Sequence, residues 1–381
     1  MSDRPAPLIR PPRLRTGEER SATRLELFFD LAYVLVLAEL AGAYAGRLAV
    51  FAGLLAVTWW SWVTITLYAN RFDTNDVLYR LAKLAAAAAV VGMAASTEDA
   101  TRFAACYLVT RVLLLLLYAR AYWHVPEART TIAIYVAGAG AAAVLWAVSL
   151  PVHGVARYLL WGAGVLVEAA APLLAGRVGR NVPLHIEHLP ERFGLFVILV
   201  LGESIASIAH GVHDTHWTAP SVLAAALAFG TVAALWWIYF DLGGAAGKRE
   251  LVEDGGDQES GVADAYVYGH LPLILGLAVT AIGIEQLILH PHDAAAPARW
   301  AVPGGVALYL AGVAVVMTGT SGRWLAAWPW PAVVIPPVLL LALLDVLHPV
   351  VSVTAVTAIL VVTVLAGIRQ QRRGALRTAE T

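Results

Sequence analysis

Apolar stretches long enough to cross a lipid bilayer recur along almost the whole sequence. A membrane-spanning helix needs ~20 mostly apolar residues, and twelve such windows are separated by short polar breaks. They cover residues 26–45, 48–69, 77–96, 101–121, 130–150, 155–176, 190–210, 218–241, 262–289, 299–319, 325–346 and 349–368. The last two windows could merge or re-enter the membrane around Pro336, Pro337 and Pro349. The pattern predicts an all-α, polytopic transmembrane helical bundle of about twelve helices.

The composition supports a membrane protein and excludes several other classes. Of 381 residues, 59% are hydrophobic and 14% are charged, and the mean hydropathy is +0.70. That is more apolar surface than a soluble domain of this size could bury in one core. The net charge of -1 gives no nucleic-acid footprint. A single cysteine allows no internal disulfide or CxxC site, and neither a metal nor a cofactor is predicted. From the apolar composition, the expected partner is the lipid bilayer.

The distribution of arginine predicts an orientation. Cytoplasmic loops of membrane proteins carry an excess of Lys and Arg. One set of alternate loops and both tails hold most of the Arg residues, whereas the other set holds only Arg47, Arg102, Arg157 and Arg299. We therefore expect an inner-membrane protein with both termini in the cytoplasm.

The windows can be grouped into two halves with tails. We expect a basic cytoplasmic tail (1–23), a first six-helix half (24–183), a second half (184–369) with a mobile cytoplasmic loop (243–261), and a second tail (370–381). Glu39 and Glu203 each lie about 13 residues into the first window of their half, and "WWSWVTITLYANRFD" ending at Asp73 has a counterpart in "LWWIYFD" ending at Asp241. Two parallel six-helix repeats are possible, because six is an even number of spans.

The first window carries three acids where charge is costly. A carboxylate at mid-membrane costs at least ~2.5 kcal/mol on insertion scales, so it normally faces the interior and has a partner. Glu26 and Asp30, four residues apart, share a helix face, while Glu39, nine residues after Asp30, points to the opposite side. Glu26 and Asp30 either form structural ion pairs with Arg24 or a loop arginine, or line an entrance.

Three more segments carry ionisable side chains into apolar windows. In the seventh window Glu191 suits the first helical turn, and Arg192 and Glu203 fall on one face. This face either lines a water-filled path or pairs with other buried groups. Arg111, in the middle of the fourth window, needs an acid, and Glu39, Glu168 or Glu203 could supply it. His270 in the ninth window could titrate near neutral pH or serve as a hydrogen-bonded anchor.

Several of these residues lie in stretches that resemble the bacterial low temperature requirement protein A (LtrA) family. The stretches are "LELFFDLAYV" (25–34), "WWSW" with "YANRFDTND" (68–76), "HLPERFGLFVILVLGESI" (188–205), "LWWIYFD" (235–241) and "YGHLPLILG" (268–276). The resemblance implies a multi-pass membrane protein, in a family named for growth at low temperature, with no settled biochemical activity. Carried over by motif, it points to Glu26, Asp30, Asn70, Arg71, Asp73, His188, Glu191, Arg192, Glu203, Asp241 and His270.

The functional hypothesis is transport of an ion or small solute through a path lined by buried carboxylates. The path would include Glu39, Glu203 and Arg192, with Arg111 as counter-charge. One alternative is an intramembrane enzyme that uses His188, Glu191, Glu203 and His270 on a lipid-like substrate. A second is a membrane-adaptation scaffold in which buried charges fix helix register without transport.

Overall fold

The computed structural model describes residues 8–15, 22–178, 188–244, 259–290, 296–321, 329–343 and 348–379. These residues form twelve α-helices, one short 3-10 helix, one π-helix and one pair of two-residue strands. Eleven of the helical segments in this described part are long and apolar enough to cross a membrane. The all-helical bundle predicted from the apolar windows is thereby confirmed.

The chain divides into two compact units. Unit 1 comprises residues 1–44 and 49–192, and unit 2 comprises 45–48 and 193–381. The division falls inside α7, whose first turn belongs to unit 1. The parallel repeat suggested by the sequence stays a prediction.

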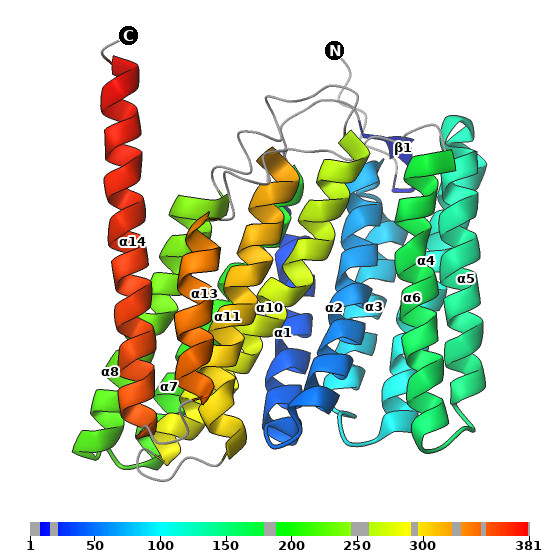
Figure 1. Ribbon diagram of the computed structural model, residues 1–381. Helices are drawn as coiled ribbons and strands as arrows, with labels where there is room; N and C mark the ends of the chain where they lie inside the picture. Colours follow the sequence, from blue (N-terminus) through cyan, green and yellow to red (C-terminus); the bar gives the residue numbers. More distant parts are fainter. Residues whose placement is uncertain are drawn as a thin grey trace. The chain divides into compact units, whose positions relative to one another are not determined.

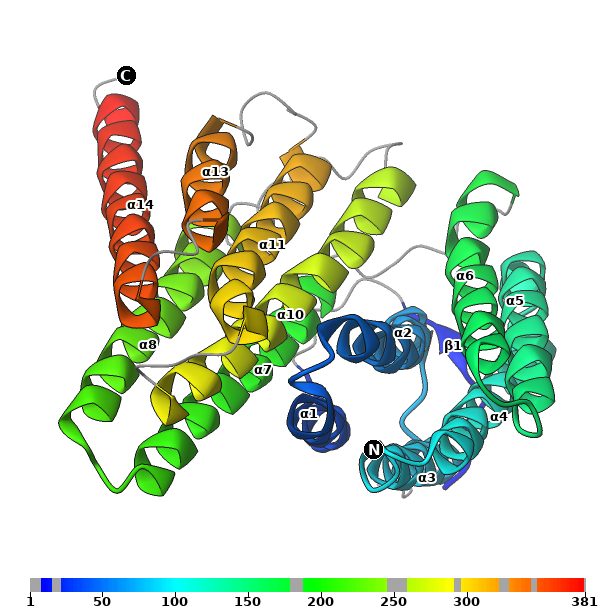
Figure 2. The same ribbon diagram turned by 60° about the horizontal axis from the view of Figure 1, so that its bottom comes forward.

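Unit 1 is a bundle of six helices, shown in blue to green in Figure 1 and seen closer to end-on in Figure 2. The helices are α1 (Arg24–Tyr44), α2 (Leu48–Arg71), α3 (Val77–Ala94), α4 (Ala100–His124), α5 (Arg129–Ser149) and α6 (Val155–Val178). The 3-10 helix η1 (Pro126–Ala128) precedes α5. Helix α2 is the most central, because every residue from Val57 to Arg71 is buried. Trp59, Trp60 and Trp62 lie in this core.

An N-terminal strap, residues 8–15, binds to the end of unit 1 where α2 ends and α3 begins. Its strand β1 (Arg13–Leu14) pairs antiparallel with β2 (Phe72–Asp73), with Arg13 opposite Asp73 and Leu14 opposite Phe72. Asp76, the N-cap of α3, accepts hydrogen bonds from the backbone amides of Tyr79 and Arg10 and from Arg120. Part of the expected cytoplasmic tail is therefore ordered against the helix ends.

Unit 2 contains the rest of α7 (His188–Asp214), α8 (Ala219–Trp237), η2 (Ile238–Gly244), α10 (Glu259–Leu289), α11 (Ala296–Ser321), α13 (Pro329–Leu343) and α14 (Pro349–Ala379). Segment η2 is a π-helix that continues α8. Helices α10, α11, α13 and α14 lie side by side in this order (Figures 1 and 2). Helices α10 and α11 touch through glycines, because a Cβ at Gly276 would lie only 2.6 Å from the carbonyl oxygen of Gly305.

The C-terminal windows differ in length from the sequence prediction. Window 325–346 forms the shorter helix α13, which contains Pro336 and Pro337. Helix α14 is separate from α13 and continues through most of the expected tail to Ala379. Within the expected mobile loop 243–261, residues 245–258 lie outside the described residues.

Candidate functional site

The beginning of α1 holds Glu26 in a capping arrangement. Thr23 precedes the helix, and its backbone amide and hydroxyl donate to Glu26 Oε2 at 2.8 and 2.9 Å. The Glu26 amide donates to Thr23 Oγ1 at 3.3 Å. A Thr and a Glu three residues apart satisfy backbone donors at a helix start in this way. Glu26 therefore serves the helix end and leaves its second oxygen for other partners.

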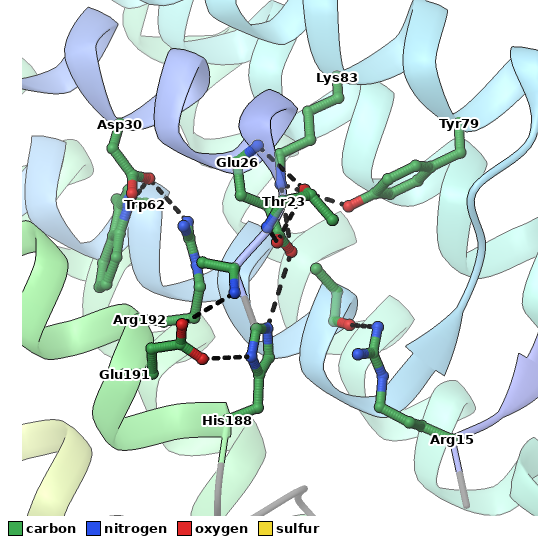
Figure 3. A network of polar contacts seen from close by, with 12 residues as sticks. Arg15, Thr23, Glu26, Asp30, Trp62, Tyr79, Lys83, His188, Glu191 and Arg192 are labelled. Carbon is green, nitrogen blue, oxygen red and sulfur yellow. Dashed lines mark hydrogen bonds and ion pairs between the residues drawn. The ribbon is translucent and has the colours of Figure 1, made fainter. Parts of the chain in front are cut away.

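Three cationic or histidine side chains surround the acids of α1. We call Glu26, Asp30, Lys83, His188 and Arg192 the entrance cluster (Figure 3). The Lys83 ammonium and the His188 ring each lie 3.9 Å from Glu26 Oε1. The Lys83 ammonium also lies 5.0 Å above the Phe29 ring. All five side chains of the cluster are buried.

Asp30 is the most enclosed member of the entrance cluster. Its Oδ1 accepts hydrogen bonds from Trp62 Nε1 and from the Arg192 guanidinium, both at 2.7 Å. Asp30 Oδ2 and one terminal nitrogen of Arg192 are buried and have no hydrogen-bond partner among the described residues. A buried ionic pair is favourable only when its remaining polar atoms are also satisfied. Asp30 thus has one acceptor oxygen, and Arg192 one donor nitrogen, without a hydrogen-bond partner among the described residues.

A second buried ionic group lies near the middle of the bundle. The central cluster consists of Ser61, Thr64, Thr110, Arg111 and Glu168. Arg111 donates to Glu168 Oε1 at 2.7 Å, to Thr64 Oγ1 at 2.8 Å and to Ser61 Oγ at 2.7 Å. Arg111 is 11 residues from the start of α4, so it lies roughly 16 Å from that end. Of the three acids considered for Arg111, the structure pairs it with Glu168.

Tyr33 extends the central cluster onto α1, one turn after Asp30. It follows Asp30 by three residues on α1 and is fully buried. Its hydroxyl lies 2.9 Å from Ser61 Oγ, the atom that also accepts from Arg111. Trp62, the neighbour of Ser61, donates to Asp30. Polar groups therefore follow one another from the first turn of α1 to the middle of α4.

Aromatic rings cover Arg111 on the side toward the beginning of α4. We call Phe103, Tyr107, Trp146 and Trp161 the ring stack. The Tyr107 and Trp146 ring centres are 3.9 Å apart, and those of Trp146 and Trp161 are 4.7 Å apart. Gly164 permits this packing, because a Cβ there would lie 2.9 Å from Trp146 Nε1. The Arg111 guanidinium lies 4.9 Å from the Tyr107 ring centre, within cation–π range.

The remaining residues expected from the sequence lie in different surroundings. Asn70 and Arg71 are buried at the end of α2, and Arg71 lies 4.9 Å from the Tyr135 ring centre. Glu191 is partly exposed, 3.6 Å from His188, and accepts from the Ala22 amide. Glu39, Asp73 and Asp241 are exposed. Glu39 lines a cavity of about 610 Å³ with residues 94–99, so it is not one of the buried carboxylates.

In unit 2, Glu203 is half-buried on α7. His270 is fully buried on α10. Its Nδ1 lies 2.7 Å from the Tyr266 carbonyl, and its Nε2 lies 2.9 Å from the Tyr239 hydroxyl. Because a carbonyl can only accept, Nδ1 carries a proton, and in the neutral ring Nε2 accepts from Tyr239. This is the hydrogen-bonded anchor that the sequence left open as one alternative.

Two ionic residues of the clusters were not singled out by sequence reasoning. The sequence does carry a signal for Lys83, because a lysine inside an apolar window indicates a buried, paired charge. Glu168 was considered only as one of three partners for Arg111. Arg24, which with the loop arginines was a candidate partner of Glu26 and Asp30, is exposed, and Arg192 pairs with Asp30. Among the described residues, no group of three or more His, Cys, Asp or Glu side chains is placed to hold a metal ion.

The helices and buried charges define a multi-pass membrane protein whose first unit encloses two linked ionic clusters. Residues 21–367 match the bacterial low temperature requirement A protein (LtrA) family. The chain belongs to this family.

A search of curated proteins finds an uncharacterized protein, RA0937, of Rhizobium meliloti (strain 1021). It is 27% identical over 320 residues, which cover 79% of this chain and 78% of that protein. No solved structure matches the chain.

Proposed function

We propose that unit 1 transports an ion or small solute along the polar groups that join the entrance cluster to the central cluster. The observation that carries this proposal is the contact of Tyr33 with Ser61, which brings a hydroxyl from the helical turn after Asp30 into contact with the group that binds Arg111. Buried ionisable residues in membrane proteins commonly mark ion or substrate pathways. The carboxylates in this route are Glu26, Asp30 and Glu168.

Several polar atoms of these charged residues lack a hydrogen-bond partner among the described residues, which supports a route that takes up an ion or water rather than a fully paired, static network. Asp30 Oδ2, Glu168 Oε2 and one Arg192 nitrogen have no hydrogen-bond partner among the described residues. Leaving a buried donor or acceptor unsatisfied costs ~1–3 kcal/mol, and more for charged groups. A transported ion, or water that accompanies it, would satisfy these atoms.

The location is part of the same proposal. The excess of arginine in one set of loops and in both tails supports a bacterial inner-membrane protein with cytoplasmic termini. The entrance cluster, at the beginning of α1, would then face the cytoplasm. Fusions of the full chain to green fluorescent protein and to alkaline phosphatase at the C-terminus test this. Phosphatase activity without fluorescence would contradict it.

Purified protein in liposomes tests transport directly. We expect flux of at least one of H⁺, Na⁺, K⁺ or Cl⁻ above that of empty liposomes, and at least a tenfold loss in Asp30→Asn. The matched control is Glu127→Gln, because Glu127 is an exposed carboxylate in η1. Glu203→Gln, in a half-buried carboxylate of α7, belongs in the same series.

The same series separates transport from the scaffold alternative. A scaffold predicts that Asp30→Asn lowers thermal stability while no ion crosses the membrane with either protein. Transport predicts flux in the wild type and its loss in a variant that elutes as a folded protein in size-exclusion chromatography. Equal flux in wild type and folded Asp30→Asn would rule out the proposed route.

A further inference from the structure

A small cavity adjoins the central cluster between α2, α4, α5 and α6. Its volume is about 10 Å³, which is room for about one water molecule. Thr64, Tyr118, Tyr135, Glu168 and Pro172 line it, and Leu and Ala side chains form the rest of the wall. The wall of the cavity is therefore mainly apolar, and Thr64, Tyr118, Tyr135 and Glu168 are its polar side chains.

Glu168 presents acceptors at this cavity. Its Oε1 accepts from Arg111, whereas its Oε2 is buried and has no hydrogen-bond partner among the described residues. Pro172 follows Glu168 by four residues inside α6. Because proline has no backbone N–H, the Glu168 carbonyl lacks the usual helical donor. An occupant that reaches these two oxygens would donate hydrogen bonds to them.

The surrounding charges limit the kind of occupant. Arg111 contacts Glu168 on one side. The Arg71 guanidinium lies 4.9 Å from the centre of the Tyr135 ring, and that ring stacks on Tyr118 at 5.7 Å. A metal cation at Oε2 would face these guanidinium groups, and an anion would face an open carboxylate oxygen. A neutral donor of water size is compatible with both the charge and the volume.

We propose that Glu168 binds and releases a proton at Oε2 through a water in this cavity, and that this proton is the ion that unit 1 transports. The inference rests on the proposed function and names its substrate. In the loading step the cavity water gives one proton to Oε2 as it takes another from a hydronium ion outside the cavity, so that each O–H bond that breaks is matched by one that forms and the cavity water stays neutral. Release reverses the step and restores the carboxylate.

The contacts of Arg111 allow this change of charge. When Glu168 is neutral, Arg111 keeps its hydrogen bonds to Thr64 Oγ1, Ser61 Oγ and the Ser61 carbonyl. It also keeps its position over the Tyr107 ring. The guanidinium is therefore held in place in both protonation states of its partner.

The other titratable groups near Glu168 can be separated from it. Among the described residues they are Tyr33 from α1, Arg71 from α2, Tyr107, Arg111 and Tyr118 from α4, and Tyr135 from α5. Tyr and Arg ordinarily lose their protons only near pH 10 or above. A protonation change seen between pH 5 and 9 therefore does not come from these Tyr and Arg side chains. Its loss in a Glu168 variant assigns it to Glu168.

Proton flux tests the inference in liposomes that contain the full chain, with a potassium gradient and valinomycin as driving force and a pH dye inside. We expect at least a tenfold loss of proton flux in Glu168→Gln. We expect a similar loss in Ala139→Leu, which fills the cavity without changing charge. Ala141→Leu, on the exposed side of α5, is the matched control and should keep wild-type flux.

Infrared difference spectroscopy provides a second measurement that does not depend on transport. Acidification of the wild type should produce a carboxylic C=O band that is absent in Glu168→Gln. Absence of this band in the wild type would overturn the inference. Flux of Na⁺, K⁺ or Cl⁻ without protons would overturn it and leave the proposed function standing, whereas absence of all ion flux would overturn both.

Discussion

Arg192 in the first turn of α7 donates a 2.7 Å hydrogen bond to Asp30 on α1, across 162 positions of the sequence. Both side chains are buried, with exposed fractions of 1% and 0%. The pair therefore connects two distant parts of the chain where water cannot replace either partner.

Breaking this pair on one side should strongly destabilise the protein. We expect Asp30→Leu or Arg192→Leu to lower the free energy of unfolding by ~3–5 kcal/mol, because each leaves an uncompensated buried charge. The double variant Asp30→Leu/Arg192→Leu should recover most of that loss. Thermal unfolding of the full chain in detergent micelles measures all three. Additive losses in the double variant would show that the two charges do not depend on each other.

The hydroxyl and the ring of Tyr107 should contribute differently. The hydroxyl is buried without a hydrogen-bond partner among the described residues, while the ring contacts Arg111 and Trp146. We expect Tyr107→Phe to leave stability unchanged or raise it by about 1 kcal/mol. Tyr107→Leu should lower it by ~2–4 kcal/mol through lost stacking and cation–π contact. Equal melting temperatures for the two variants would contradict this assignment.

Asp76 should make stability depend on pH. It lies between the spans of α2 and α3. Burial opposes its ionisation, but hydrogen bonds from Arg120 and from the amides of Tyr79 and Arg10 outweigh this and lower its pKa. Because the pKa of Asp76 in the folded protein lies below its ordinary value of 3.8, the ionised carboxylate stabilises the fold at pH values above 3.8. This stabilisation is lost as the pH falls through the folded-state pKa.

We therefore expect Asp76→Asn to be less stable than the wild type by ~1.5–3 kcal/mol at pH 7. The difference should narrow as the pH falls below about 4. Melting curves at both pH values measure it. Asp99→Asn is the comparison, because Asp99 is also an N-cap, of α4, but its side chain is 43% exposed and accepts from the amides of Thr101 and Arg102, so that its removal should have a smaller effect. A constant difference across pH would contradict the role of the Asp76 charge.

The close approach of α10 and α11 should make Gly276 intolerant of a side chain. A Cβ there would collide with the backbone of Gly305 and Tyr309. We expect Gly276→Ala to lower stability by ~1–3 kcal/mol or more through overpacking. Gly304→Ala is the matched control, since nothing lies within 4 Å of its Cβ position. That variant should be neutral or slightly stabilising in a helix. A similar melting temperature for both variants would contradict the described packing.

The sequence predicted the helices because bilayer thickness dictates the length of each apolar window. It also predicted that Asp30 and Glu39 face opposite sides, since 100° per residue follows from helix geometry. Asp30 is buried and Glu39 is exposed. The partners could not be predicted in the same way. Arg24 is close to Asp30 in sequence but is exposed, whereas Arg192 reaches Asp30 only through tertiary packing.

The central cluster illustrates the same limit. A buried arginine at position 111 requires an acid, but several acids lie at suitable depths in the sequence. Only the packing of α4 against α6 selects Glu168. The unsatisfied oxygen of Glu168 and the cavity beside it depend on side-chain positions, which carry no signal in residue spacing alone.

The ring stack closes the side of Arg111 that faces the beginning of α4. Phe103, Tyr107, Trp146 and Trp161 present ring faces where a migrating charge would need water or carboxylates. If unit 1 transports protons as proposed, α5 and α6, which carry the two tryptophans, must separate from Tyr107 before a proton can leave on that side.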